Sequence, residues 1–129
     1  MPEIRNSHTN NHRKEITNMK ILKSFNVSKL DVINSTSSKS FKAVMPTDKL
    51  IVTGCAHVLD ESEKGGEFAY LYTRDGEVYG GNAANAIKLV GDLCSLFEDE
   101  DGADAYAVEV RPGTSNSGKT FLTFHVSNV

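Results

Sequence analysis

The chain has 129 residues, with 14 Lys and Arg against 17 Asp and Glu, two Cys and no Trp. This length fits one small domain, and 24% charged residues is ordinary for a soluble globule. The formal net charge of −3 excludes a histone-like, globally basic nucleic-acid binder, although a local basic groove stays compatible with it. No apolar run approaches the roughly 20 residues that span a bilayer, so we expect a cytoplasmic protein without a membrane partner.

Residues 1–18 are polar and have no hydrophobic periodicity, which predicts a disordered N-terminal tail. Met19 directly precedes the first patterned segment, and Lys14-Glu15 can be encoded as a ribosome-binding sequence upstream of it. One hypothesis is therefore that translation starts at Met19. The alternative is that the tail is an oligomerisation arm. In both cases residues 19–129 are expected to form a single domain.

The first part of this domain reads as short strands. Ile21 to Asn34 alternates loosely, and Ser40 to Val44 is a short strand ended by a Pro-containing turn. Lys49 to Leu59 is the strongest strand and carries apolar residues on both faces, as in a barrel. Gly54 in its middle predicts a bulge or a bend.

A hairpin and one helix follow. Phe68 to Arg74 and Glu77 to Tyr79 are predicted strands, and the Asp75-Gly76 pair between them is a strong hairpin signal. Asn82 is a suitable N-cap for a helix over Ala83 to Glu98, where apolar residues recur at helical spacing.

Two last strands are predicted at Asp104 to Arg111 and Lys119 to Ser127, joined by a Gly- and Ser-rich loop. The element order predicts a mainly β fold, an OB-like five-stranded barrel with one helix between its third and fourth strands. A PC4-like α+β sheet, or a small α+β sandwich, gives a similar order and is the alternative.

Signatures of catalysis and of metal binding are missing from the sequence. It has no G-x-S-x-G and no H-E-x-x-H, and Ser117-Gly118-Lys119-Thr120 opens a strand, whereas a phosphate-binding loop precedes a helix. His8 and His12 lie in the polar tail, and the cysteines Cys55 and Cys94 are expected to be buried free thiols. We therefore expect a non-enzymatic protein without metal or other cofactor.

Aromatic and basic residues interleave on several predicted strands. Tyr70, Tyr72 and Arg74 are two apart and so share a face, with Tyr79 on the return strand. Binding of single-stranded nucleic acid needs this pairing, because aromatic planes stack on bases while cations follow the phosphates. Tyr70 and Tyr72 could instead be core or rim residues. The candidate contact residues are Tyr79, Tyr70, Tyr72, Arg74, Phe121, Lys119, Lys42 and Arg111.

Several short pieces, taken together in order, resemble a known family. They are Ser40-Phe41-Lys42 before the Pro turn, Asp75-Gly76-Glu77-Val78-Tyr79, Gly91 to Leu96, Val108-Glu109-Val110, Gly113-Thr114-Ser115 and Ser117-Gly118-Lys119 with Phe121 and Phe124. Their order and spacing resemble the single-stranded DNA-binding proteins of small protein-primed podophages, which replicate by strand displacement.

The resemblance implies an OB-like fold that coats displaced single strands during viral replication in the bacterial cytoplasm, without sequence preference. It also implies the replication DNA polymerase as a partner, and homo-oligomers formed through N-terminal residues. Family members contact DNA through tyrosines, and the Tyr of the D-G-x-x-Y piece corresponds to Tyr79. Other contact tyrosines of the family have no counterpart, because Val58 and Leu59 stand in that region; Tyr70 and Tyr72 are the substitutes to consider.

Two other functions fit the same sequence. One is RNA binding. The other is a protein-binding regulatory module, such as a phage inhibitor of a host enzyme, that uses the acidic segment 98–104. Residues 19–129 hold 11 basic and 15 acidic residues, and five of these acids lie in that segment. The rest of the domain is then balanced at 11 against 10, so the acidic total is largely one local feature, which we expect to lie away from a DNA groove.

Overall fold

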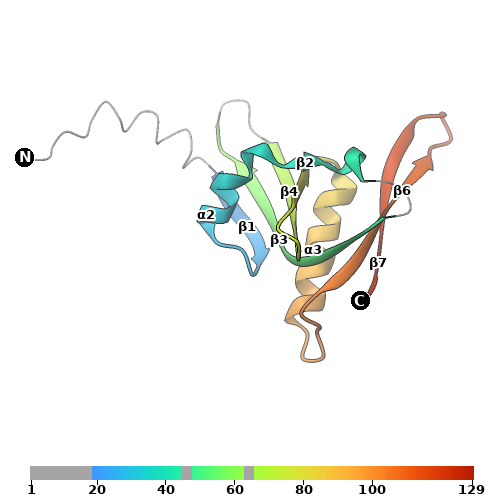
Figure 1. The fold of residues 1–129 in the computed structure, drawn as a ribbon. Coiled ribbons are helices and arrows are strands. Elements are labelled where there is room, and N and C mark those ends of the chain that lie inside the picture. Colours follow the sequence, from blue (N-terminus) through green and yellow to red (C-terminus); the bar gives the residue numbers. More distant parts are fainter. Residues whose placement is uncertain (1–18, 45–47, 63–65) are drawn as a thin grey trace, which may run out of the picture.

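The computed structural model describes residues 19–44, 48–62 and 66–129 (Figure 1). The predicted tail, the hypothesis of a start at Met19 and the histidines His8 and His12 fall on residues 1–18, outside the described part. Within that part, no helix is long and apolar enough to cross a membrane. The elements are β1 (Met19–Phe25), α2 (Lys29–Ile33), η1 (Asn34–Ser37), β2 (Lys39–Ser40), η2 (Phe41–Ala43), β3 (Lys49–Asp60), β4 (Gly66–Thr73), β5 (Val78–Gly81), α3 (Ala84–Glu98), β6 (Tyr106–Thr114) and β7 (Thr120–Asn128).

The fold is mainly β: one curled, mixed sheet forms a half-barrel with α3 as its main helix (Figure 1). The strand order is β2-β5-β4-β3-β6-β7, and β1 pairs with β3 beside this path. All described pairings are antiparallel except β2 with β5, which is parallel. The sheet therefore has more strands than the five of the predicted barrel, because β1 and the two-residue β2, from the segments before Lys49 that also read as strands, join it.

The long strand β3 changes partners at Gly54. Its first four residues pair with β6, and its later part lies between β4 and β1. The register to β4 shifts between Val52 and Gly54, which confirms the predicted bulge. A Cβ at Gly54 would lie 3.0 Å from Cγ2 of Val27 and 3.1 Å from the carbonyl oxygen of Phe25. The absence of a side chain thus lets the chain after β1 cross close over the bend.

Side-chain alternation divides the apolar residues between the two faces of the sheet. One cluster joins Leu71 of β4 and Val108 of β6 to the buried face of α3. The second cluster lies on the other face, where Tyr70 of β4 packs with Val58 of β3 and Val32 of α2. The free cysteines Cys55 and Cys94 are buried in the first cluster with their sulfur atoms 3.5 Å apart, as expected for free thiols.

Two predicted strands are wrong in part. β1 ends at Phe25, and the chain then turns at Asn26 (φ 56°) into α2. The Ser28 hydroxyl accepts from the backbone N–H of Asp31, whose carboxylate accepts from the Ser28 N–H, so a capping box starts a helix inside the segment predicted as strand. The strand predicted over Ser40 to Val44 is also wrong in part, because β2 ends at Ser40 and the chain then forms the 3₁₀ turn η2.

The N-cap of α3 also differs from the prediction. Ala83 occupies this position and makes no side-chain cap bond, while Asn82 lies one residue outside. The side chain of Asn85 in the first turn instead donates to the carbonyl of Leu122, at 3.0 Å. This bond ties the start of α3 to β7.

Candidate nucleic-acid interface

The half-barrel has an open side between β5 and β7, which do not pair in the part of the chain that the structure describes. η2 places Phe41 in this opening. The ring of Tyr79 on β5 stacks on Phe41 with centroids 6.5 Å apart, and Phe41 meets Phe124 of β7 edge-on at 5.2 Å. We call these three residues the aromatic row. Its side chains pack between β5 and β7, which no backbone ladder connects among the described residues.

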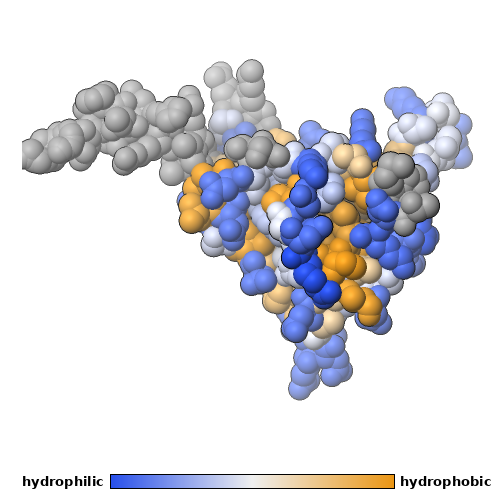
Figure 2. Space-filling view, in the orientation of Figure 1, coloured by the Kyte–Doolittle hydropathy of each residue, from blue (hydrophilic) through white to orange (hydrophobic). Residues whose placement is uncertain are grey.

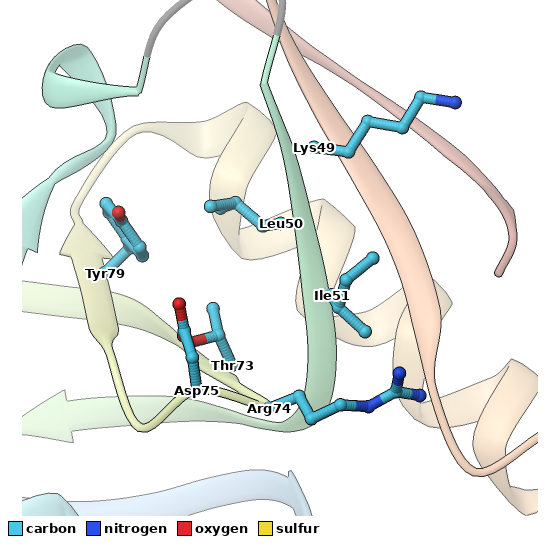
Figure 3. A pocket seen from close by; sticks show the side chains of 7 residues that line it. All are labelled: Lys49, Leu50, Ile51, Thr73, Arg74, Asp75 and Tyr79. Carbon is cyan, nitrogen blue, oxygen red and sulfur yellow. The ribbon is translucent and has the colours of Figure 1, made fainter.

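A hollow lies at the β3 side of the aromatic row, and we call it the Tyr79 pocket (Figure 3). Its volume is about 380 Å³. Figure 3 shows Tyr79 on one side of β3 and the charged ends of Lys49 and Arg74 on the other, with Leu50 and Ile51 between them. A chain that crosses β3 here would meet an aromatic ring first and two cations next.

A second hollow lies at the other end of the row, between η2, the start of α3 and the β6–β7 hairpin. This Phe121 groove has a volume of about 650 Å³ and a largely apolar lining with one cation, Lys42. Figure 2 shows apolar surface in the middle of the face seen in Figure 1, bordered by hydrophilic residues. The residues that line the groove are Phe41, Lys42, Ala83, Ala84, Asn85, Pro112, Thr120, Phe121, Leu122 and Phe124.

The cations that line the two hollows form no ion pair with another described residue. The ion pairs among residues 19–44, 48–62 and 66–129 are Lys39–Glu77, His57–Glu67, Lys88–Asp92 and Arg111–Glu109, so none of them involves Lys42, Lys49 or Arg74. Asp75 is the acidic residue of the Tyr79 pocket. Its carboxylate accepts a hydrogen bond from the Thr73 hydroxyl, which lowers the pKa of Asp75 and keeps a negative charge in the hollow.

The β6–β7 hairpin presents three of the predicted contact residues. Phe121 is 42% exposed and lines the groove, and Lys119 is exposed at the end of the hairpin. Arg111 lies opposite Thr123 in the ladder, and its guanidinium donates to Glu109 at 2.7 Å. Among the predicted contact cations, Arg111 is therefore the one that forms an ion pair with another described residue.

The structure does not present Tyr70 and Tyr72 as a stacking platform, which corrects that expectation. Tyr70 is 8% exposed, and Tyr72 is half-buried with its hydroxyl 2.6 Å from the Ser35 hydroxyl. Burial raises the pKa of both phenols. The segment of α2 and η1 covers their face of the sheet because Val32 and Ser35 pack onto it. The alternative of a core or rim position for both tyrosines is the one that the packing agrees with.

Residue-level reasoning from the sequence left Phe41, Lys49 and Phe124 outside the site. The sequence predicts Phe41 within a strand over Ser40 to Val44, whereas in the structure it begins the 3₁₀ turn η2 and its ring stacks on Tyr79. The Ser28-x-x-Asp31 pattern could have indicated the start of a helix here, but not that this helix covers Tyr70 and Tyr72.

The acidic segment lies away from both hollows. The end of α3 and the loop that follows form the lowest part of Figure 1, whereas η2 and the tip of the β6–β7 hairpin lie at the top. The backbone N–H of Ala103 donates to the hydroxyl of Tyr106, which fixes the loop to β6. The acids therefore lie apart from the two hollows, and their distance from a DNA groove stays a prediction.

Comparison of the chain with protein-family models, with curated proteins and with solved structures finds no match. A function for this protein therefore has to be inferred from the geometry of the open side and from the residue pattern.

Proposed function

We propose that the protein binds single-stranded DNA without sequence preference along the open side of the half-barrel, and that it coats displaced strands during bacteriophage replication in the host cytoplasm. The observation that carries this proposal is the partly exposed ring of Tyr79, which stacks on the buried Phe41. Beside it lie the cations Lys42, Lys49 and Arg74, which form no ion pair with another described residue. The setting in viral replication comes from the resemblance of the chain to podophage single-stranded DNA-binding proteins.

The proposal includes a finer assignment of the fold. We take β3 to β7 as the five strands of an OB-like barrel whose third and fifth strands, β5 and β7, remain apart. Two observations support this assignment. The bent first strand, β3, pairs with β4 of the β4–β5 hairpin and with β6 of the β6–β7 hairpin, and α3 lies in the chain between the third and fourth strands. The aromatic row then occupies the place where a closed barrel would have a ladder.

The chemistry of such a site is stacking and charge neutralisation. A base that stacks on an aromatic ring contributes roughly 1–3 kcal/mol whatever its identity, because every base has a π-face. Cations along the path replace counterions of the phosphates, which makes the affinity fall as salt rises. Neither interaction needs a cofactor.

The face of the sheet that carries Tyr70 and Tyr72 is covered, which limits where a DNA strand can bind. α2 and η1 occupy the surface over Tyr70 and Tyr72, so stacking there would require displacing Val32 and Ser35 from buried positions. The open side needs no such rearrangement. We therefore propose that the DNA strand crosses β3 at the Tyr79 pocket and follows η2 to the Phe121 groove.

Fluorescence anisotropy with labelled oligonucleotides tests the proposal. The full chain is titrated against oligo-dT, a mixed-sequence single strand, a duplex of the same sequence and an oligo-rU, at low and at physiological salt. We expect similar affinities for the two DNA single strands, weaker binding of the duplex and of RNA, and a loss of affinity with salt. Absence of single-strand binding at low salt would contradict the proposal, and a preference for oligo-rU would turn it toward RNA.

A further inference from the structure

On the β6–β7 hairpin, outside the aromatic row, the ring of Phe121 contacts Gly113. The two residues are direct partners in the ladder. A Cβ added to Gly113 would lie 2.8 Å from Cε2 and from Cζ of Phe121, closer than atoms pack. The ring thus occupies the space that a side chain at Gly113 would fill, and Phe121 as a whole is 42% exposed at the rim of the Phe121 groove.

We infer that Gly113 is a positioning residue, which holds the Phe121 ring as a ready stacking platform for one nucleobase of a single strand. This inference rests on the proposed function. An exposed ring that rotates freely loses that freedom when a base stacks on it, whereas a ring already fixed on one face does not. Lys119 on the same hairpin and Lys42 across the groove supply charge for the adjoining phosphates.

A purely structural role for the contact is the competing explanation. Aromatic rings packed across a strand pair from glycine compensate for the missing side chain and stabilise the sheet. In that case the contact would matter for unfolding but not for DNA affinity. The two explanations predict different readouts for the same substitutions.

Gly113→Ala is the substitution that separates them. Gly113 is not among the glycines with positive φ, so alanine fits its backbone. The new Cβ meets only the outer atoms of an exposed ring, which can swing away at small cost to folding. Phe121→Leu is the companion variant, because leucine still covers Gly113 but has no aromatic face. Gly91→Ala is the control, since a Cβ at Gly91 meets nothing within 4 Å.

The experiment measures oligo-dT affinity by anisotropy for these variants and for Gly113→Ala combined with Phe121→Leu. The ring-current shift of the Gly113 α-protons, measured by NMR, reports the ring position without DNA. We expect Phe121→Leu to bind oligo-dT about tenfold more weakly than the wild type, and Gly113→Ala to bind nearly as weakly as Phe121→Leu. The double variant should bind no more weakly than Phe121→Leu. The Gly91→Ala control should bind like the wild type.

Wild-type affinity in Gly113→Ala, with the ring shown to be displaced, would overturn the inference and leave the proposed function standing. So would a further loss when Gly113→Ala is added to Phe121→Leu, because the glycine would then act apart from the ring. A wild-type protein that fails to bind oligo-dT, while the ring-current shift shows Phe121 over Gly113, would instead refute the proposed function itself.

Discussion

The hydroxyl oxygens of Tyr72 and Ser35 lie 2.6 Å apart and join β4 to the segment that follows α2. The Ser35 hydroxyl also donates to the carbonyl of Asp31 at 2.7 Å, so Tyr72 is the donor to Ser35. Ser35 is 2% exposed. A serine that is buried between a tyrosine and a helix end fixes the segment over the outer face of the sheet.

Replacing Ser35 by alanine should therefore destabilise the protein. The Tyr72 hydroxyl would lose its partner in a half-buried position, and such a loss costs about 1–3 kcal/mol of unfolding free energy. Urea unfolding followed by circular dichroism measures this value. Tyr72→Phe is the matched variant, and the double variant should be less destabilised than the sum of the singles. Strict additivity would contradict the bond.

The buried phenol of Tyr72 should make stability depend on alkaline pH. Burial raises its pKa from 10 to about 12, partly offset by the bond to Ser35. A raised pKa means that the folded state disfavours the ionised phenol, so this contribution to stability is complete below pH 10 and is lost as pH rises toward 12. Urea unfolding across this range should show the decline, and Tyr72→Phe should show a smaller one. Equal pH dependence in both proteins would contradict the assignment.

The cysteine pair should be inert in the folded protein. Cys55 and Cys94 are both completely buried, and the hydrogen bond with Cys94 together with burial raises the pKa of the Cys55 thiol. A colourimetric thiol reagent should therefore react with neither sulfur in buffer and with both in urea, in step with unfolding. Fast reaction of one thiol in the native protein would show that the packing of α3 on β3 is looser than described.

How far the sequence predicts this structure depends on the range of the interaction. The bulge at Gly54, the Asp75-Gly76 hairpin and the span of α3 follow from local patterns, and the structure has them within one or two residues. The aromatic row could not be predicted in this way. Tyr79 and Phe41 are far apart in sequence, and their stacking depends on a parallel pairing of only two residues between β2 and β5.

The site residues show the same division. Phe121, Lys119 and Lys42 are exposed, as candidate contact residues have to be. Tyr70 and Tyr72 also share a face, as their spacing required. What covers that face is α2, which comes from a distant part of the chain, and strand periodicity carries no information on it.

Charge changes in the Tyr79 pocket should alter DNA affinity in opposite directions. Asp75→Asn removes a negative charge near the proposed phosphate path and keeps an acceptor for the Thr73 hydroxyl, so affinity should rise severalfold. Lys49→Gln and Arg74→Gln should each lower affinity and reduce the salt slope by about 1. Asp104→Asn makes the same charge change as Asp75→Asn in the remote acidic loop and serves as the control. An equal gain in both would show a general charge effect.

Removing the ring of Tyr79 should weaken binding about tenfold, the loss of one stacked base. Tyr79→Phe keeps the ring on Phe41 and should bind nearly as the wild type does. Intrinsic tyrosine emission offers a second readout, because of the four tyrosines Tyr79 is the one that lines the described pocket. Oligo-dT should quench the wild type, and Tyr79→Ala should show little quenching. Unchanged affinity in Tyr79→Ala would remove this residue from the site.

The location of the bound strand is tested most directly by NMR, through the backbone amide shifts of the labelled full chain during titration with oligo-dT. We predict that the largest changes fall on Tyr79, Phe41, Phe121 and their neighbours on the open side. Residues 28–35 and the acidic segment 98–104 should stay close to their free positions. Changes concentrated on α2, or on the acidic segment, with an unperturbed aromatic row would contradict the account.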